Sequence, residues 1–321
     1  MLRTIGVVTP GGDAPGMNAA IRAITRIAHA NGFQVLGFER GWDGLLTNNF
    51  KRLTPRSVGG IIQLGGTMLH TLRCPNFEKK KGIKKAIKTL AVNKLDGLVV
   101  IGGDGSFRGA LDLSRGSDTP IIGVPATIDN DVFGTDETIG FDTAVNTAVR
   151  AIDQIRDTAI SHERIFIVEV MGRKRGFLAL DVGITVGAEV ILVPENECKI
   201  TQILQVLREN ARKGKKTGII VAAEGIGDTA ALSKEIEKQT GSEVRLSILG
   251  YAQRGGSPTA RSRLLASLFA EKAVNLLCQE QGNRVVGLRS GLVSSIELQE
   301  SCETRKSLDP SLLELAEMLA T

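Results

Sequence analysis

Residues 127–131, TIDND, place three short polar side chains at alternate positions, directly after the apolar run of residues 121–126. If this segment is extended, alternation directs Thr127, Asp129 and Asp131 to one side of the chain. One carboxylate can then take a proton from a hydroxyl group while the other assists a bound metal ion. A solvated acidic turn without chemical function is the alternative interpretation, and the residues alone leave it open.

A second acidic segment, GGDGS at residues 102–106, also follows an apolar run. A turn requires only the glycines, so Asp104 suggests a ligand, because carboxylate oxygen suits Mg²⁺ that is bound together with phosphates. An Asx turn or a helix cap would explain Asp104 without any ligand. The glycine loop GGDAPG at residues 11–16 precedes an amphipathic run, where free N–H groups attract phosphate. It matches neither the GxGxxG nor the Walker A pattern.

Arginine recurs beside the glycine-rich segments and at the expected ends of strands. The guanidinium group matches two phosphate oxygens at once, whereas any single arginine is more often a surface residue. Together they predict more than one anionic ligand. The residues concerned are Arg73, Arg164, Arg173, Arg175, Arg245 and Arg254.

The elements that must position these residues alternate between apolar, β-branched runs and amphipathic runs. We expect strands at residues 4–10, 33–38, 97–101, 121–126, 164–170, 188–194, 217–225 and 283–288. We expect helices at residues 17–30, 140–158, 200–214 and 259–282. Strands this apolar are covered on both faces, which favours parallel sheets, and such sheets bind ligands at the carboxyl ends of their strands. The expected fold class is α/β, with two Rossmann-like lobes that each contain a mainly parallel sheet flanked by helices.

Length and composition set further bounds. The 321 residues exceed the ~250–300 at which one core stops growing, which favours two lobes. A formal net charge of +5 with one Trp and one Tyr does not call for a nucleic-acid partner. Four scattered Cys and three His predict neither a disulfide framework nor a zinc site. We found no leader segment and no apolar stretch near ~20 residues, so we expect a cytoplasmic protein without a membrane partner.

Six motifs occur in family order and spacing along nearly the whole chain: GGDAPGMNAAIR, VVIGGDGS, TIDND, TIGFDTA, VEVMGR and LGYAQRGGSP. By these motifs the sequence resembles the bacterial-type ATP-dependent 6-phosphofructokinases. GGDG alone is weak, because NAD kinases and diacylglycerol kinases share it, whereas the full series is specific. The resemblance implies a larger ATP-binding lobe at residues 1–139 plus about 252–303. It also implies a smaller fructose-6-phosphate-binding lobe at residues 140–251 plus about 304–321.

The resemblance further implies Mg²⁺-dependent transfer of the ATP γ-phosphoryl group to the 1-hydroxyl of fructose 6-phosphate, with Asp129 as the general base. The residues implied around the transferring group are Gly12, Asp104 as the metal ligand, Thr127, Asp131 and Arg173. Those implied at the nucleotide are Gly12, Arg73, Cys74, Gly103, Asp104, Gly105 and Ser106. Those implied at the sugar phosphate are Thr127, Ile128, Asp129, Met171, Gly172, Arg173, Glu224, Tyr251 and Arg254, with Arg164 and Arg245 from a neighbouring subunit.

The resemblance also implies a homo-oligomer, usually a tetramer, with an effector site for ADP or phosphoenolpyruvate. The matching residues are Arg22, Arg26, Arg156, Gly187, Glu189, Lys213, Lys215 and Lys216. Regulation of the activity is therefore an expectation of the resemblance, although Pro55 and Gly59 stand where effector-site Arg and Ser often occur.

Several further positions depart from the family pattern. Tyr251 stands where the bacterial enzymes usually have His, and Cys74 and Glu78 replace common aromatic and basic residues near the adenine. Pyrophosphate-using relatives carry Lys and Asp where this chain has Ala126 and Gly105, so small uncharged residues favour ATP as the donor. A pyrophosphate-dependent enzyme remains the nearest alternative, and a non-catalytic nucleotide or sugar-phosphate sensor is another. A dinucleotide oxidoreductase is disfavoured because the GxGxxG signature is absent.

Overall fold

The computed structural model describes residues 3–196 and 198–319. The chain divides into two compact units. Unit 1 comprises Met1–Thr143 and Arg254–Lys306, and unit 2 comprises Ala144–Gln253 and Ser307–Thr321. Each unit contains its own sheet with helices packed against it, which confirms the expected α/β class.

Unit 1 is built on an eight-stranded sheet in the order β12-β11-β5-β4-β1-β2-β3, with the short β6 paired to β5. The strands are β1 (Arg3–Val8), β2 (Phe33–Phe38), β3 (Phe50–Leu53), β4 (Gly97–Gly102), β5 (Ile121–Thr127), β6 (Ile139–Gly140), β11 (Arg284–Arg289) and β12 (Leu292–Glu297). All pairings are parallel except those of the edge strands β3 and β12. β12 returns antiparallel because Ser290 and Gly291, at φ 50° and 79°, form a tight turn after β11.

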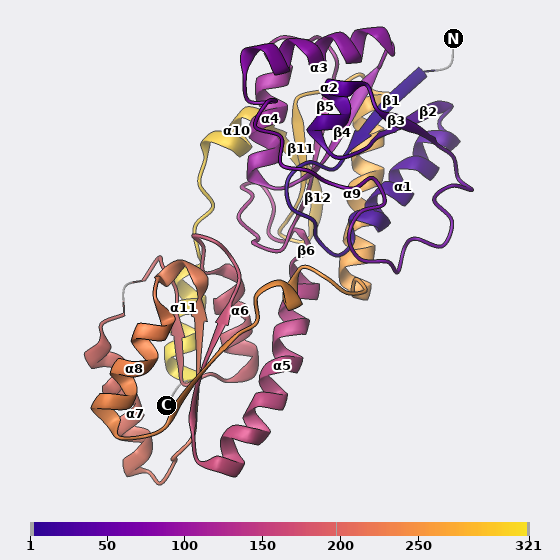
Figure 1. Cartoon of the computed structure of the whole chain (residues 1–321). Coiled ribbons are helices and arrows are strands. Elements are labelled where there is room, and N and C mark those ends of the chain that lie inside the picture. The colour runs from indigo at the N-terminus through magenta and orange to yellow at the C-terminus, as the bar shows by residue number, and fades with distance from the viewer. Residues whose placement is uncertain (1–2, 197, 320–321) are drawn as a thin grey trace. The chain divides into compact units, whose positions relative to one another are not determined.

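Helices cover both faces of this sheet. They are α1 (Met17–Ala30), α2 (Trp42–Thr47), α3 (Lys80–Val92), α4 (Asp104–Ser114), α9 (Ala260–Cys278) and α10 (Leu298–Glu303). α1 and α9 pack together on one face, and α2, α3 and α4 lie on the other (Figure 1). The expected helix at 17–30 is confirmed to the residue, because Gly16 at φ 107° precedes it and Gly32 at φ 79° follows its C-cap.

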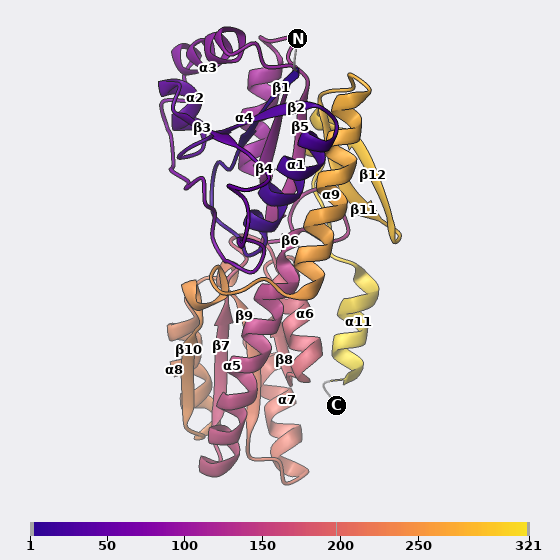
Figure 2. The same cartoon turned by 90° about the vertical axis from the view of Figure 1, so that its right-hand side faces the viewer.

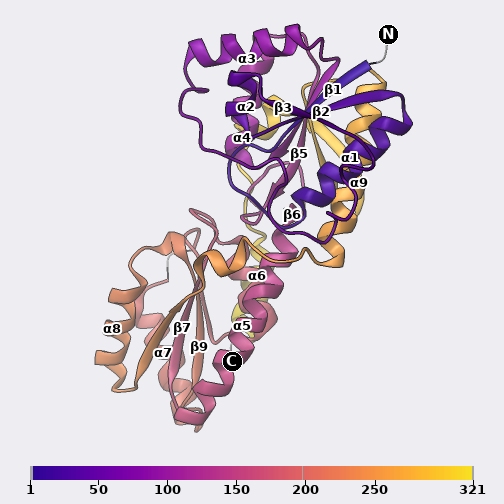
Figure 3. The same ribbon diagram turned by 45° about the vertical axis from the view of Figure 1, so that its right-hand side comes forward.

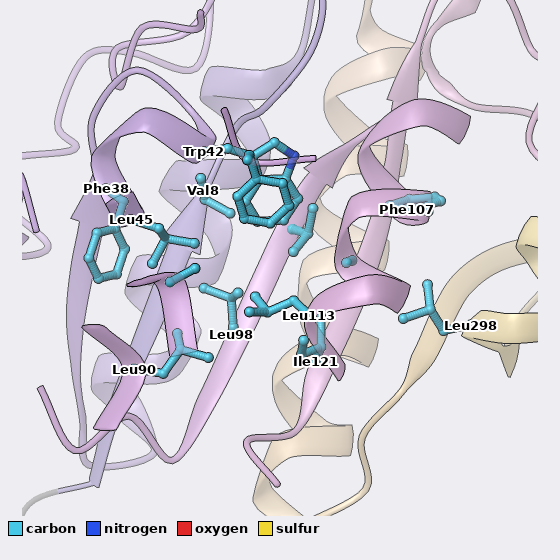
Figure 4. Packing of buried hydrophobic residues seen from close by; sticks show 14 of the residues in the cluster. Val8, Phe38, Trp42, Leu45, Leu90, Leu98, Phe107, Leu113, Ile121 and Leu298 are labelled. Carbon is cyan, nitrogen blue, oxygen red and sulfur yellow. The ribbon is translucent and has the colours of Figure 1, made fainter. Parts of the chain in front are cut away.

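One hydrophobic core of unit 1 fills the space between the sheet and α2, α3 and α4 (Figure 4). β4 contributes Leu98 to this core, and Phe107 of α4 packs into it from the helix side. Trp42 stacks on Phe77 with ring centroids 4.2 Å apart and planes within 7° of parallel. The first turns of α2 and α4 are therefore held by large apolar contacts, which stiffens the loops that precede them.

Replacing Leu98 with alanine should lower the free energy of unfolding by about 2–5 kcal/mol, because it leaves a cavity in a fully buried site. Trp42 is the single tryptophan of the chain and lies in the same core, so its fluorescence during urea unfolding reports on unit 1. Leu292→Ala is the matched control, since Leu292 is 74% exposed on the edge strand β12. Equal unfolding midpoints for the two variants would contradict the assigned core.

Unit 2 contains a smaller, fully parallel sheet in the order β10-β7-β9-β8 (Figure 2). Its strands are β7 (Ile165–Val170), β8 (Val190–Leu192), β9 (Gly218–Ala223) and β10 (Val244–Ile248). Its helices are α5 (Phe141–His162), α6 (Phe177–Val186), α7 (Ile200–Arg212), α8 (Thr229–Thr240) and α11 (Pro310–Leu319), with short 3-10 turns η1 (Glu224–Ile226) and η2 (Gly250–Gln253).

The two faces of this second sheet are covered by different helices (Figure 3). Alternate residues of β7 and β9, such as Ile167 and Ile220, pack with Leu207 of α7 and Ile236 of α8. The opposite face of the sheet is covered by α6, on which α11 packs in turn. Successive side chains of each strand point to opposite faces of the sheet. Because helices cover both faces, these strands are apolar throughout. Within residues 3–196 and 198–319, we find no helix that has both the length and the apolarity for a membrane crossing.

Candidate functional site

In unit 1, the chain leaves β1 and β4 in opposite directions, which opens a crevice at their carboxyl ends. After β1 it crosses through α1 to β2, and after β4 it crosses through α4 to β5 on the other side. Such a switch point is the usual ligand site of an open parallel sheet. The segments 11–16 and 102–106, selected from the sequence for their glycines, flank this crevice from the two sides.

Ser106 joins the two glycine segments. Its Oγ donates a hydrogen bond of 2.7 Å to the backbone oxygen of Pro10, and the residue is 5% exposed. A Cβ added at Gly11 or Gly102 would lie 2.9 or 2.4 Å from this Oγ, so neither position has room for a side chain. The resemblance implied that Ser106 contacts nucleotide, but its hydroxyl is used to hold the loops after β1 and β4 together.

Arg254 covers the backbone of the first glycine loop. A Cβ at Gly12 would lie 2.4 Å from Arg254 Nη1, and the same Nη1 donates a 3.4 Å hydrogen bond to the backbone oxygen of Asp13. Arg254 was implied at the sugar phosphate and Gly12 at the transferring group. Their contact within unit 1 places a guanidinium charge directly beside the backbone of the loop that precedes α1.

Asp104 is the first residue of α4, where the helix dipole favours a carboxylate. Its Oδ1 and Oδ2 accept hydrogen bonds of 3.2 and 3.0 Å from Arg108 Nε, one turn further along the helix. Burial, and to a lesser degree the charge of Asp104, raises the pKa of the Cys302 thiol to about 11. Arg108 was not selected from the sequence, although an Asp and an Arg four residues apart can pair on one face of a helix.

A single carboxylate suits a metal ion whose other ligands are substrate phosphates and water. Among the residues that the structure describes, no three His, Cys, Asp or Glu side chains gather around a point where they could hold a metal ion. Mg²⁺ usually binds through one or two carboxylates together with substrate phosphates and water. Asp104, 36% exposed at the mouth of the crevice, fits that kind of site.

The TIDND segment is not extended, so the expected alternation of its side chains is wrong. β5 ends at Thr127, and Asn130 adopts a left-handed conformation with φ 51° that turns the chain. The Asn130 side chain accepts a 3.1 Å hydrogen bond from the Thr138 backbone N–H and donates one of 3.1 Å to the Asp136 backbone oxygen. Asn130 is 5% exposed and was not selected from the sequence; Asn is one of the few residues that tolerate this conformation.

This turn brings the loop after β5 to the same crevice. Asp129 is 3% exposed, and its backbone N–H donates a 3.2 Å hydrogen bond to Thr127 Oγ1. A Cβ at Gly103 would lie 3.2 Å from the Thr127 Cβ, so the two loops touch. The buried Ile128 anchors the turn. Unit 1 therefore gathers the segments at Gly12, Asp104 and Asp129 around the carboxyl ends of β1, β4 and β5.

The nucleotide candidates Arg73 and Cys74 lie in the same unit, in the segment between β3 and α3. Cys74 is half-buried and packs against the core that contains Trp42 and Phe107. Gly105, in contrast, has open space around a built Cβ. Cys74, Cys198, Cys278 and Cys302 are free thiols in the structure.

In unit 2, the candidates Met171, Gly172, Arg173, Glu224 and Tyr251 all follow the carboxyl ends of neighbouring strands. Glu224 Oε1 accepts a hydrogen bond of 3.2 Å from the Gly172 backbone N–H and another from that of Arg173. The loop is tight, with φ 134° at Gly172 and φ 54° at Arg173. Tyr251 is 80% exposed in η2. One oxygen of Glu224 is therefore committed to shaping this loop.

Arg164 and Arg245 do not belong to that edge of the sheet. Arg164 directly precedes β7, and Arg245 is the second residue of β10. The expectation that these two arginines stand at the ligand-binding ends of strands is wrong, because both lie at the amino ends. A six-residue strand spans roughly 20 Å, too far for these side chains to reach a group held by Tyr251 of the same chain. Their guanidinium groups both contact Glu243.

The effector candidates gather only in part. In unit 2, Gly187, Glu189, Lys213 and Lys215 line one cavity of about 160 Å³, together with Asn210. Glu189 is 3% exposed, and Lys215 forms an ion pair with it.

The remaining effector candidates are not among the residues that line this cavity. Arg156 donates to the backbone oxygen of Val186, beside Gly187. Lys216 instead pairs with Glu163. Arg22 and Arg26 lie on α1 of unit 1, where Arg26 donates to the backbone oxygen of Pro55.

Comparison with known proteins adds a family context. The family model described as Phosphofructokinase matches residues 4–277. The chain is 50% identical over 321 residues to "ATP-dependent 6-phosphofructokinase 1" of Thermus thermophilus, covering 99% of this chain and all of the relative. It is 47% identical over 319 residues to "ATP-dependent 6-phosphofructokinase" of Brevibacillus brevis, covering 99% of this chain and all of the relative. Among solved structures, Pichia pastoris phosphofructokinase in the T-state superposes with a TM-score of 0.89 and 33% identity, over 94% of this chain and 35% of that one.

Proposed function

The chain belongs to the phosphofructokinase family, and we propose on this premise that it transfers the γ-phosphoryl group of ATP to the 1-hydroxyl of fructose 6-phosphate. The products are fructose 1,6-bisphosphate and ADP. The observation that carries the proposal is the buried Asp129 at the crevice of unit 1, next to the loop that contains Asp104. A phosphate-binding crevice with a general base in it is what a sugar-phosphate kinase requires.

The proposed chemistry assigns Asp129 the proton of the acceptor hydroxyl. Phosphoryl transfer depends mainly on positioning and on stabilising the phosphate charge, so the protein has little covalent chemistry to perform. Asp129 accepts the proton as the sugar oxygen attacks the γ-phosphorus. The backbone at Gly12 and the hydroxyl of Thr127 bind the phosphoryl oxygens, and Arg173 and Asp131 complete the set taken from the resemblance. The free N–H groups at the start of α1 favour the same anion.

Asp104 is the proposed protein ligand of Mg²⁺. When bound, Mg²⁺ neutralises phosphate charge and so lowers the barrier to attack by the sugar hydroxyl. Arg108 holds the Asp104 carboxylate in place through both of its oxygens and competes with a cation for them. The nucleotide itself is proposed to bind along Arg73, Cys74 and residues 103–106.

Unit 1 is the proposed ATP-binding lobe and unit 2 the proposed fructose-6-phosphate-binding lobe. Met171–Arg173 and Glu224 are proposed to contact the sugar, with Tyr251 at its phosphate. Because Arg164 and Arg245 lie at the amino ends of β7 and β10, they can reach a sugar phosphate held at Tyr251 only if that tyrosine belongs to another copy of the chain. This supports the proposal of a homo-oligomeric enzyme, with a tetramer as the expected form and ADP or phosphoenolpyruvate as effectors at the cavity around Glu189.

The purified protein should form fructose 1,6-bisphosphate with ATP at least tenfold faster than with pyrophosphate. Gly105 has open space around it, which leaves room for the nucleotide beyond the β-phosphate. Ala126 gives weaker support for ATP as the donor, because it is 1% exposed within β5. The measurement is a coupled assay with fructose 6-phosphate, Mg²⁺ and each donor in turn. Activity with pyrophosphate alone would overturn the choice of donor, and no product with either would favour a sensor.

A further inference from the structure

Glu243 connects Arg164, directly before β7, with Arg245 of β10 in unit 2. Its Oε2 accepts a hydrogen bond of 2.5 Å from Arg164 Nε, and its Oε1 accepts one from Arg245 Nη2. The Ile165 backbone N–H donates a 3.1 Å hydrogen bond to the Glu243 backbone oxygen, which fixes the two chain segments side by side. One carboxylate therefore uses a donor from each guanidinium, with one oxygen for each.

This group carries a positive excess, because two guanidinium groups share the one carboxylate of Glu243. Lys216 forms a further ion pair with Glu163, which adjoins Arg164 in the chain. The hydrogen bond and the charge of Arg164, followed by the charge of Arg245, lower the pKa of Glu243, so it is ionised at neutral pH. Arg245 is 56% exposed and Glu243 37% exposed, which leaves the group open to a ligand from solvent or from a second copy of the chain.

The contribution of these ion pairs to folding stability is a weak explanation for the arrangement of Glu243 between two arginines. Exposed ion pairs contribute little to folding, because water and salt screen them. A pair of guanidinium groups that faces solvent is, in contrast, well suited to a phosphate monoester, whose oxygens match their forked donors. The carboxylate of Glu243 occupies one donor of each guanidinium and offsets part of their positive charge. A phosphate group must therefore displace Glu243 or share the arginines with it.

We propose that Glu243 is a built-in competitor for a phosphate monoester at the Arg164–Arg245 pair and thereby sets the affinity of this site. The identity of the ligand as the 6-phosphate of the sugar rests on the proposed function, whereas the competition itself rests on the contacts of Glu243. Glu243 is a specificity-determining residue in this account, and it takes no part in the phosphoryl transfer.

Glu243→Gln should tighten the binding of fructose 6-phosphate by about two- to tenfold, since removing one charge from two exposed ion pairs changes the competition by about that factor. The amide keeps the shape of the side chain and one acceptor oxygen. Isothermal titration calorimetry on the full chain without nucleotide gives the dissociation constant directly. Arg164→Ala should weaken binding. In the double variant Arg164→Ala/Glu243→Gln, the gain from the glutamine should be lost, because the two residues act on one site.

Glu237→Gln is the matched control, because it removes one exposed carboxylate from α8 of the same unit. It should leave the dissociation constant unchanged, and equal melting temperatures of all variants would establish that they are folded. An unchanged or weaker affinity in Glu243→Gln would overturn the inference and would make Glu243 a support for the arginines. A gain in affinity from Glu243→Gln that persisted in the absence of Arg164 would also overturn the inference.

Inorganic phosphate as a second probe separates this inference from the proposed function. If fructose 6-phosphate fails to bind and no product forms, the proposed function is wrong, yet Arg164-dependent binding of phosphate that tightens in Glu243→Gln would still support the competition. If the enzyme turns over fructose 6-phosphate normally while Glu243→Gln binds both probes like the unchanged chain, the inference alone is wrong. Absence of any Arg164-dependent phosphate binding would likewise overturn it.

Discussion

Asp129→Asn should lower kcat by about 10²- to 10⁴-fold, the usual loss when a positioned general base is removed. The amide has nearly the same shape but cannot accept the proton of the sugar hydroxyl at neutral pH. Asp129 is 3% exposed at the turn after β5, so water cannot easily replace it as the base. Steady-state kinetics with saturating ATP should show the loss in kcat, with the KM for fructose 6-phosphate changed by less than about threefold.

Asp118→Asn is the matched control for that experiment. Asp118 is an exposed aspartate that precedes the same strand, at the opposite end from Asp129. It should retain the full rate. If Asp129→Asn turned over at a rate close to that of the unchanged chain, Asp129 would lose the role of base and the carboxylate of Asp131 would be the next candidate.

Gly12→Ala should lower kcat/KM by about 10²-fold while leaving the melting temperature nearly unchanged. The added Cβ would lie 2.4 Å from Arg254 Nη1, so the guanidinium must move away from the loop. Because the contact is with the end of a flexible side chain, this costs little folding energy. A shift of about 1 Å in a group that positions substrate is nevertheless enough for such a loss of activity. The measurement is kcat/KM together with thermal unfolding of the same protein.

Gly255→Ala is the control for Gly12→Ala, because a Cβ at Gly255 would meet no atom within 4 Å although it adjoins Arg254 in the chain. It should keep its activity. A Gly12→Ala enzyme that works at the normal rate would mean that Arg254 does not need its present place over the loop. A variant that unfolded at a much lower temperature would mean that the loop supports the fold more than the site.

Much of the fold could be predicted because its signals are local. The apolar runs predicted as strands are β1, β4, β5, β7 and β9, which are covered on both faces. A strand of that kind has the same apolar sequence pattern wherever its sheet lies in the fold. Glycines at 16 and 32 marked the limits of α1 for a backbone reason, since their positive φ is costly for other residues. The antiparallel edges β3 and β12 were not foreseen, because a short turn decides their direction.

The sequence was sufficient to predict which loops form the candidate site, but not the conformation of each loop. The order of the motifs placed Gly12, Asp104 and Asp129 after strands, and parallel strands bring their carboxyl ends to one edge. The position of Arg164 at the amino end of its strand could also have been predicted, because the apolar run begins with this residue. The turn at Asn130 was not readable, since an acidic, polar segment of five residues is compatible with both an extended and a turned backbone.

Residue types and their spacing were sufficient to establish the α/β class, the loops that carry the chemistry and the resemblance to a kinase family, because each depends on a few consecutive residues. Packing alone decided that Arg254 lies on Gly12 and that Glu243 binds Arg164, pairs that are 242 and 79 residues apart. Such contacts depend on how whole strands and helices close on one another. No local preference of the chain encodes which distant side chains will meet.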